Sequence, residues 1–178
     1  MTKARQMSFG SLGPIGDAML ALTPTSISLM VASLLLLSSF GLEYLVGLEP
    51  CYLCLRERYL HLLLVGLGLF FWRLQFLPGL GLITLGLAWS VSTILAGAHA
   101  GFEYGFWYLD LPCGGSGPAL SLEALQADLE GRSPPPCDEP AITFLGISLA
   151  GANFLISGAM AFYLFKSRFT KGLMSGQP

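Results

Sequence analysis

Charged side chains are scarce in this chain of 178 residues. Lys, Arg, Asp and Glu make up 11% of it, whereas an ordinary soluble domain holds about 25%. Hydrophobic residues make up 53%, and the mean hydropathy is +0.66. A single core built from this length of chain cannot bury so much apolar surface. The sequence therefore excludes a water-soluble globule and predicts a membrane protein.

Several functional signatures are also missing. Nine Lys and Arg against eleven Asp and Glu give a formal net charge of -2, with no basic stripe of the kind that neutralises phosphates. The chain contains no internal repeat and no glycine-rich loop that would hold a phosphate group. These absences exclude nucleic-acid binding and leave the apolar segments and the cysteines to carry the function.

Four apolar stretches are long enough to cross a bilayer as helices, which takes about 20 residues each. They cover residues 26–48, 51–72, 79–98 and 141–165, and a polar loop at about 101–140 separates the last two. The predicted fold class is an all-α membrane protein, a four-transmembrane-helix bundle with a long exported loop. A cleaved signal peptide is disfavoured, because the first stretch exceeds about 15 apolar residues and no A-x-A site follows it.

The orientation follows from the basic residues, which cytoplasmic loops retain. One side of the arrangement carries Lys3, Arg5, Arg73, Lys166, Arg168 and Lys171. Seven of the eleven acids fall between the third and fourth spans: Glu103, Asp110, Glu123, Asp128, Glu130, Asp138 and Glu139. We therefore expect a cytoplasmic N-terminal extension at 1–25, a membrane domain at 26–168 and a cytoplasmic tail at 169–178.

The exported loop is expected to contain a short helix. Ser121 is a suitable N-cap, Gly131 a suitable end, and Leu122, Leu125 and Leu129 share one helical face. Such a helix fits the membrane surface, as an interfacial helix, and it fits equally well as a small helix packed on the bundle. The prolines at 134–136 favour an extended approach to the next cysteine.

All four cysteines, Cys51, Cys54, Cys113 and Cys137, fall on the exported side. An even number in an oxidising compartment predicts disulfides, which are either structural staples or redox centres. Cys51 and Cys54 follow Pro50 at the start of the second span, where the free N–H groups of a helix favour a thiolate. Because so short a loop makes a weak staple, this placement favours thiol–disulfide exchange.

In the run PCYLCLRERYLH, a step of about 100° per residue aligns Cys51, Cys54, Arg58 and His61 and turns Arg56 away. Arg58 is suited to stabilise a thiolate or to bind an oxygen-rich ligand. The alternative is that its side chain snorkels to the membrane interface, and this is the interpretation favoured for Arg56. His61 lies roughly 10 Å deeper than Cys54 and either borders a ligand or bonds within the bundle. No metal is predicted, because Cys113 and Cys137 form no second short knuckle and an oxidising exterior competes for thiols. A thioredoxin-like α/β unit does not fit either.

The chain resembles the disulfide bond formation protein DsbB family of bacterial inner membranes over about residues 26–168. The resemblance rests on PCYLCLRER, the four spans, the paired loop cysteines, and the segments AGAHAGFEYGFW and CDEPAITFLGISLAGANFLIS. It implies a multi-pass thiol:quinone oxidoreductase, with its cysteines on the periplasmic side, that reoxidises a DsbA-like thioredoxin-type oxidant. The implied cofactor is ubiquinone or menaquinone.

The family scheme also implies a role for each cysteine. Cys113 would receive the attacking thiolate of the partner, and Cys137 would then attack Cys51. Cys54, released as a thiolate, would contact the quinone, and Arg58 matches the family arginine associated with quinone binding. His61 is a further candidate quinone contact, from its place on the same stripe.

Three alternatives are weighed against this assignment. A family paralogue would serve a dedicated substrate, and a non-enzymatic tetraspan protein would hold two inert structural disulfides. A vitamin K epoxide reductase-like oxidase is disfavoured, because its C-x-x-C lies late in the bundle. His99 and Glu103 form an i, i+4 pair at the exported mouth, for which the sequence supplies no assignment beyond a structural one.

Overall fold

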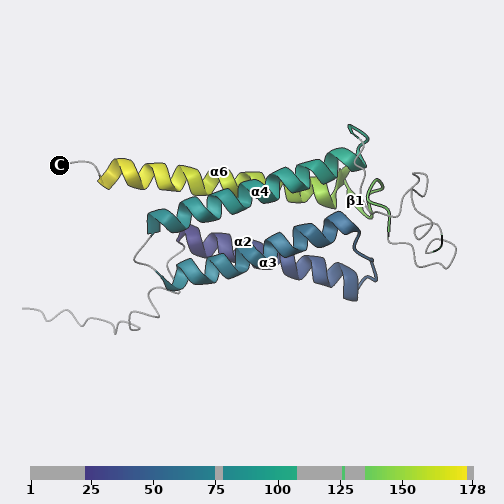
Figure 1. The fold of residues 1–178 in the computed structure, drawn as a ribbon, viewed down its shortest axis with the longest axis horizontal. Helices are drawn as coiled ribbons and strands as arrows, with labels where there is room; N and C mark the ends of the chain where they lie inside the picture. The colour runs from purple at the N-terminus through teal and green to yellow at the C-terminus, as the bar shows by residue number, and fades with distance from the viewer. Residues whose placement is uncertain (1–22, 75–77, 108–125, 127–134, 176–178) are drawn as a thin grey trace, which may run out of the picture.

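Four long helices lie side by side in the computed structural model (Figure 1), which describes residues 23–74, 78–107, 126 and 135–175, without the side chains of 78 and 171–175. The helices are α2 (Pro24–Tyr44), α3 (Tyr52–Arg73), α4 (Pro78–Glu103) and α6 (Leu149–Ser175). Two short strands, β1 (Thr143–Phe144) and β2 (Ile147–Ser148), form an antiparallel hairpin ahead of α6. The predicted, mostly helical fold is confirmed. Cys113 and most of the predicted loop helix lie outside the described residues.

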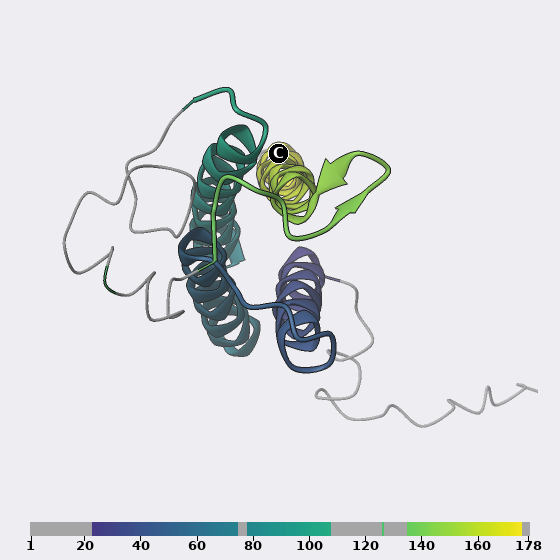
Figure 2. The ribbon, with the colours of Figure 1, turned by 90° about the vertical axis from the view of Figure 1, so that its right-hand side faces the viewer.

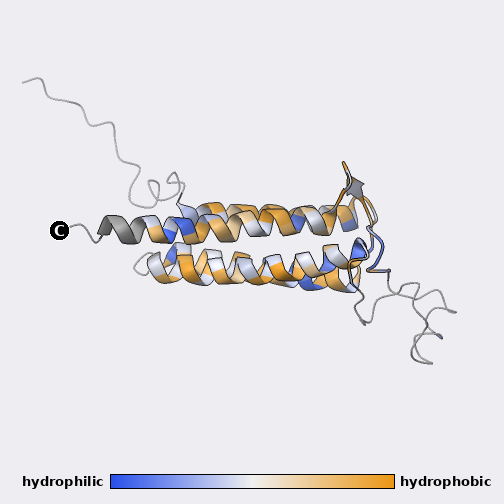
Figure 3. Ribbon diagram, turned by 90° about the horizontal axis from the view of Figure 1, so that it is seen from above, coloured by the Kyte–Doolittle hydropathy of each residue, from blue (hydrophilic) through white to orange (hydrophobic). Residues whose placement is uncertain are grey.

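Among the described residues, three helices are long and apolar enough to cross a membrane: Pro24–Tyr44, Gly79–Glu103 and Leu149–Thr170. The fourth, α3, is equally long, with 22 residues, but Arg56, Glu57 and Arg58 interrupt its apolar run in the second turn. Hydrophobic residues predominate along the four helices (Figure 3). Side chains such as Leu37, Ile94 and Phe162 are 66–72% exposed, an arrangement suited to lipid and unfavourable in water.

The bundle is built from two closely packed helix pairs, α2 with α3 and α4 with α6, which α3 and α4 join (Figure 2). Its central core contains Leu64 of α3, Leu85 and Trp89 of α4, and Leu164 of α6, all at most 1% exposed. Trp89 Nε1 donates to Ser28 Oγ of α2 at 2.8 Å, so the buried indole finds a partner. This core fixes the relative positions of the four helices, which carry the candidate site at one end of the bundle.

The predicted start of the fourth helix at residue 141 is wrong. Residues 143–148 form the β1–β2 hairpin, with positive φ at Leu145 (52°) and Gly146 (81°), as a two-residue type I′ turn requires. The helix begins only at Leu149, where Ser148 Oγ accepts from the backbone N–H of Gly151 at 3.0 Å. A short apolar run fits a strand as well as a helix, so hydrophobicity alone misplaced this boundary.

The third helix also extends beyond its predicted end at Ala98, reaching Glu103. It ends in a Schellman arrangement, in which Gly105 has φ 71° and the N–H of Phe106 donates to the Gly101 carbonyl at 2.8 Å. Trp107 folds back over Gly101, where a Cβ atom would lie 2.0 Å from the indole, and Nε1 of Trp107 donates to the Ala98 carbonyl. The extra turn brings His99 and Glu103 inside the helix that faces the start of α3.

Candidate active site

A dithiol stands at the start of α3. Cys51 is the N-cap residue, and its Sγ accepts a hydrogen bond from the backbone N–H of Cys54 at 3.3 Å. The two sulfur atoms lie 2.8 Å apart, and both cysteines are free. Pro50 precedes the pair, so the helix starts where the C-x-x-C pattern predicts. The sulfurs need only a small displacement to reach the S–S bond length of about 2.05 Å.

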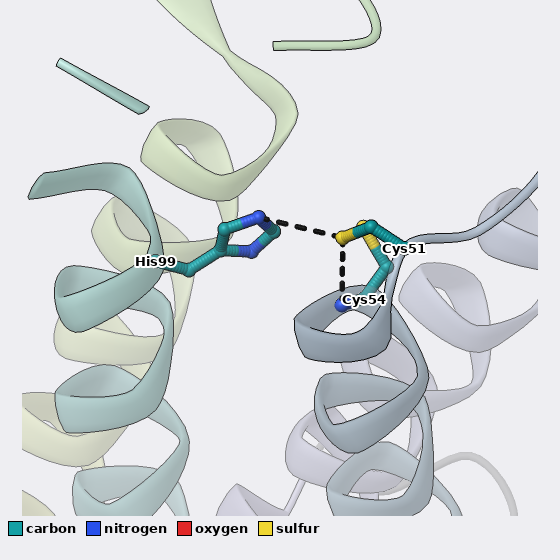
Figure 4. A group of neighbouring side chains, drawn as sticks. All are labelled: Cys51, Cys54 and His99. Atoms are coloured by element: carbon teal, nitrogen blue, oxygen red, sulfur yellow. Dashed lines mark hydrogen bonds between the residues drawn. The ribbon is translucent and has the colours of Figure 1, made fainter. Parts of the chain in front are cut away.

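His99 of α4 points at this dithiol (Figure 4). Its Nε2 lies 3.6 Å from Cys51 Sγ, and the side chain is only 2% exposed. Hydrogen bonds from Cys54 and then from His99 favour the charged form of Cys51 and outweigh its burial. They lower the pKa of this thiol, which lies just ahead of the first residue of α3. Cys51 is therefore the thiolate of the reduced pair.

Glu57, which the sequence analysis passed over, links three helices behind the dithiol. Its Oε1 accepts from Nδ1 of His99 at 2.8 Å, and its Oε2 accepts from Nδ2 of Asn153 at 2.6 Å. Asn153 Oδ1 in turn accepts from Ser157 Oγ at 3.1 Å. The carboxylate fixes the imidazole with Nδ1 protonated, so that Nε2 faces the sulfurs. A carboxyl group within an apolar helix is the signal that would have identified it.

Glu103, one turn beyond His99, lies next to the same imidazole. Its Oε1 is 3.6 Å from His99 Nε2, and the Glu103 side chain is 5% exposed. The second oxygen, Oε2, is buried without a hydrogen-bond partner among the described residues. The i, i+4 pair that had no assignment thus belongs to the surroundings of the dithiol.

Arg56 and Arg58 of α3 differ in their exposure and in their hydrogen-bond partners. The Arg58 side chain is 9% exposed, donates to Glu43 of α2, and donates from Nε to Ser39 Oγ at 3.0 Å. Its guanidinium also lies over the ring of Phe40, 4.5 Å from the centroid. Arg56 is exposed and bonds the Tyr52 hydroxyl. The outward position of Arg56 agrees with snorkelling, whereas Arg58 is held inside the bundle.

His61 lies two turns below the dithiol on the same side of α3. Its Nδ1 is 2.8 Å from the backbone oxygen of Glu57, which can only accept, so Nδ1 carries the hydrogen. In the neutral ring Nε2 is then an acceptor, and it is buried without a partner among the described residues. Trp89 stands edge-on to the ring at 5.9 Å. His61 thus offers a single unused acceptor atom.

A cavity of about 420 Å³ joins these groups. Such a volume falls in the range of about 300–1,000 Å³ typical of small-molecule sites. Its apolar lining includes Leu35, Leu36, Leu42, Leu149 and Ile156, and its polar lining includes Cys51, Cys54, Glu57, Arg58, His61, His99, Glu103 and Asn153. A cavity whose surface is largely apolar, with ionisable side chains and a dithiol on its wall, suits thiol redox chemistry coupled to an apolar ligand.

Cys137 approaches the same site from the loop. It is 1% exposed and packs in one cluster with Cys51, Leu53 and Phe102. Cys137 is disulfide-bonded, whereas Cys51 and Cys54 are free. Cys113, its predicted partner, lies outside the described residues. A disulfide-bonded cysteine of the loop and the N-terminal cysteine of the dithiol thus belong to one buried cluster.

The comparisons with known proteins agree with this geometry. No curated protein and no solved structure matched the chain. The family model described as disulfide bond formation protein DsbB matches residues 23–166, from the N-cap of α2 into α6. The match includes every described residue of the dithiol, its histidine and the cavity. The chain therefore belongs to the DsbB family of membrane disulfide oxidoreductases.

Proposed function

We propose that this protein is a thiol:quinone oxidoreductase of the bacterial inner membrane that reoxidises a DsbA-like periplasmic oxidant. The observation that carries the proposal is the free Cys51–Cys54 dithiol, which lines an apolar cavity inside the bundle. In this arrangement all four helices cross the membrane. Both termini are cytoplasmic, and the dithiol faces the periplasm.

The cavity residues fit a quinone, either ubiquinone or menaquinone. Such a ring is apolar apart from its oxygens, and the cavity combines leucine and isoleucine side chains with the unpartnered Nε2 of His61. Cys54, Arg58 and His61 would hold the ring. A bound quinone supplies an acceptor for two electrons and two protons. The buried Glu57 and His99 keep the dithiol end of the cavity polar.

The thiol–disulfide steps proposed here are those that the family resemblance implies. A thiolate of the partner attacks the Cys113–Cys137 disulfide at Cys113, and the second partner thiol then releases the partner in its oxidised form. The thiolate of Cys137 attacks Cys51, the bond between Cys51 and Cys54 breaks, and Cys54 leaves as a thiolate. Cys113 then displaces Cys51 and restores the loop disulfide. Each round moves two electrons from the partner to the Cys51–Cys54 pair, while His99 stabilises Cys51 as it leaves.

Purified protein, reduced and then freed of reductant without oxygen, is expected to lose thiols when a soluble ubiquinone analogue is added. One quinol should form for every two thiols lost, because each disulfide that forms releases two electrons. Alkylation followed by mass measurement counts the thiols that remain. Four persisting thiols without quinol would refute the proposal and favour structural disulfides. Turnover with quinone but not with a DsbA-like dithiol would identify a family member that serves a dedicated substrate.

Replacement of Arg58 by Ala is expected to raise the quinone KM at least tenfold, whereas Arg56→Ala leaves it nearly unchanged. Arg58 lines the cavity and is buried, and Arg56 faces outward. Steady-state quinone reduction measures both variants. Arg58→Ala also removes the bonds to Glu43 and Ser39, so thermal unfolding in detergent should accompany the assay. Equal KM values for the two variants, at equal stability, would contradict the assignment of Arg58.

A further inference from the structure

Three metal-binding side chains converge at the dithiol. One ligand atom each from Cys51, Cys54 and His99 lies within 4.8 Å of the others. Two thiolate sulfurs and an imidazole nitrogen bind Zn²⁺ in preference to cations such as Mg²⁺ and Ca²⁺, which favour oxygen ligands. The spacing of the loop cysteines, which form no second knuckle, had argued against a metal. In the structure, the third ligand atom is a ring nitrogen of His99, which comes from α4.

The carboxylate of Glu103 lies next to His99, although it is outside the group of three whose ligand atoms lie within 4.8 Å of one another. Glu103 Oε1 is 3.6 Å from His99 Nε2, a distance typical of two ligands on one tetrahedral ion with bonds of about 2.0–2.2 Å. The other oxygen of Glu103 is buried and has no hydrogen-bond partner among the described residues. A buried carboxylate oxygen that lacks a hydrogen bond is unfavourable. A bound metal would satisfy it.

His99 makes the second hydrogen bond that is typical of metal-ligating histidines. Such residues donate their second ring N–H to a carboxylate, which fixes the orientation of the ring and raises its basicity. The Nδ1 of His99 donates to Glu57 at 2.8 Å, and this leaves Nε2 directed at the sulfurs. Glu57 is itself held by Asn153. The ligand is therefore oriented before any ion binds.

We propose that the reduced protein binds one Zn²⁺ through Cys51, Cys54 and His99, with the carboxylate of Glu103 turning toward the ion as the fourth ligand. Binding displaces the thiol proton of Cys54 and the Nε2 proton with which His99 bonds Cys51, and it moves no electrons. The sulfurs separate by about 1 Å to bind one ion at about 2.3 Å each, a shift that side-chain rotation provides. The disulfide form cannot supply two thiolates, so zinc binding and oxidation of the pair exclude each other. Zinc thus holds the dithiol reduced and inhibits the oxidase, independently of which acceptor the enzyme uses.

The test uses the full chain in detergent with Cys113→Ser and Cys137→Ser, so that only the C-x-x-C remains. Reduced and oxidised samples, without oxygen, are titrated with Zn²⁺ against a chromophoric indicator, and bound metal is counted after gel filtration. Co²⁺ in place of Zn²⁺ reports thiolate ligation through its charge-transfer absorption. We expect one ion per reduced chain and none per oxidised chain.

Matched variants identify the ligands. His99→Ala and Glu103→Gln are expected to weaken zinc binding at least tenfold, and Glu57→Gln by about 10–100-fold through the orientation of His99. Glu139→Gln, which removes an exposed carboxylate of the same cavity, should bind zinc like the parent. Absence of binding to the reduced parent, equal binding to the oxidised form, or unchanged affinity in His99→Ala would each overturn the proposal. These measurements contain no quinone, so they fail or succeed separately from the oxidase assay.

Discussion

In a chain whose sole cysteine is Cys51, the thiol is expected to titrate well below the ordinary cysteine pKa of about 8.5. This chain carries Cys113→Ser, Cys137→Ser and Cys54→Ser. The hydroxyl introduced by Cys54→Ser still donates to Cys51 Sγ. His99 Nε2, 3.6 Å away, also favours the thiolate. Replacement of His99 by Ala should raise the midpoint by more than one pH unit. The ultraviolet absorbance of the thiolate measures it directly.

The sign of this effect follows from linkage. Groups that hydrogen-bond to the charged form lower the pKa of Cys51, so the thiolate is present above that lowered value and is lost as pH falls through it. Removal of His99 shifts the loss to higher pH. His61→Ala is the matched control, because the described bond of His61 goes to the Glu57 backbone and not to the dithiol. An equal shift in both histidine variants would contradict the role assigned to His99.

Features set by neighbouring residues could be predicted from the sequence. The N-cap position of Cys51 follows from Pro50 and the C-x-x-C spacing, and the opposite directions of Arg56 and Arg58 follow from helical periodicity. Each depends on one helix alone. Periodicity failed where an apolar run fits two structures, as in the hairpin before Leu149.

Features that depend on contacts between helices could not be predicted. Glu57, His99 and Asn153 come from α3, α4 and α6, and 96 positions separate the first from the last. Nothing in the local pattern of any one helix specifies which of the other helices it faces. A rule that treats every ionisable residue within an apolar helix as functional would have selected Glu57 and His99 without identifying them as partners.

The Glu57→Gln variant is expected to destabilise the bundle by about 1–3 kcal/mol, the cost of a buried donor without an acceptor. The carboxylate accepts from both His99 and Asn153, whereas the amide offers one oxygen and turns its NH₂ group toward the other donor. Thermal unfolding in detergent measures the loss. Ser157→Ala, which removes only the outer bond to Asn153, is the control and should cost less.

Adding Asn153→Asp to Glu57→Gln separates the two functions of the carboxylate. The new carboxylate at 153 accepts from the amide at 57, so each donor regains an acceptor and most of the stability should return. The negative charge, however, now lies on residue 153, which does not contact His99 directly. Its electrostatic stabilisation of the imidazole is therefore weaker. The Cys51 midpoint should therefore lie above that of the parent in the double variant. Recovery of both stability and midpoint would show that Glu57 acts only by packing the helices together, and recovery of neither would contradict the paired geometry.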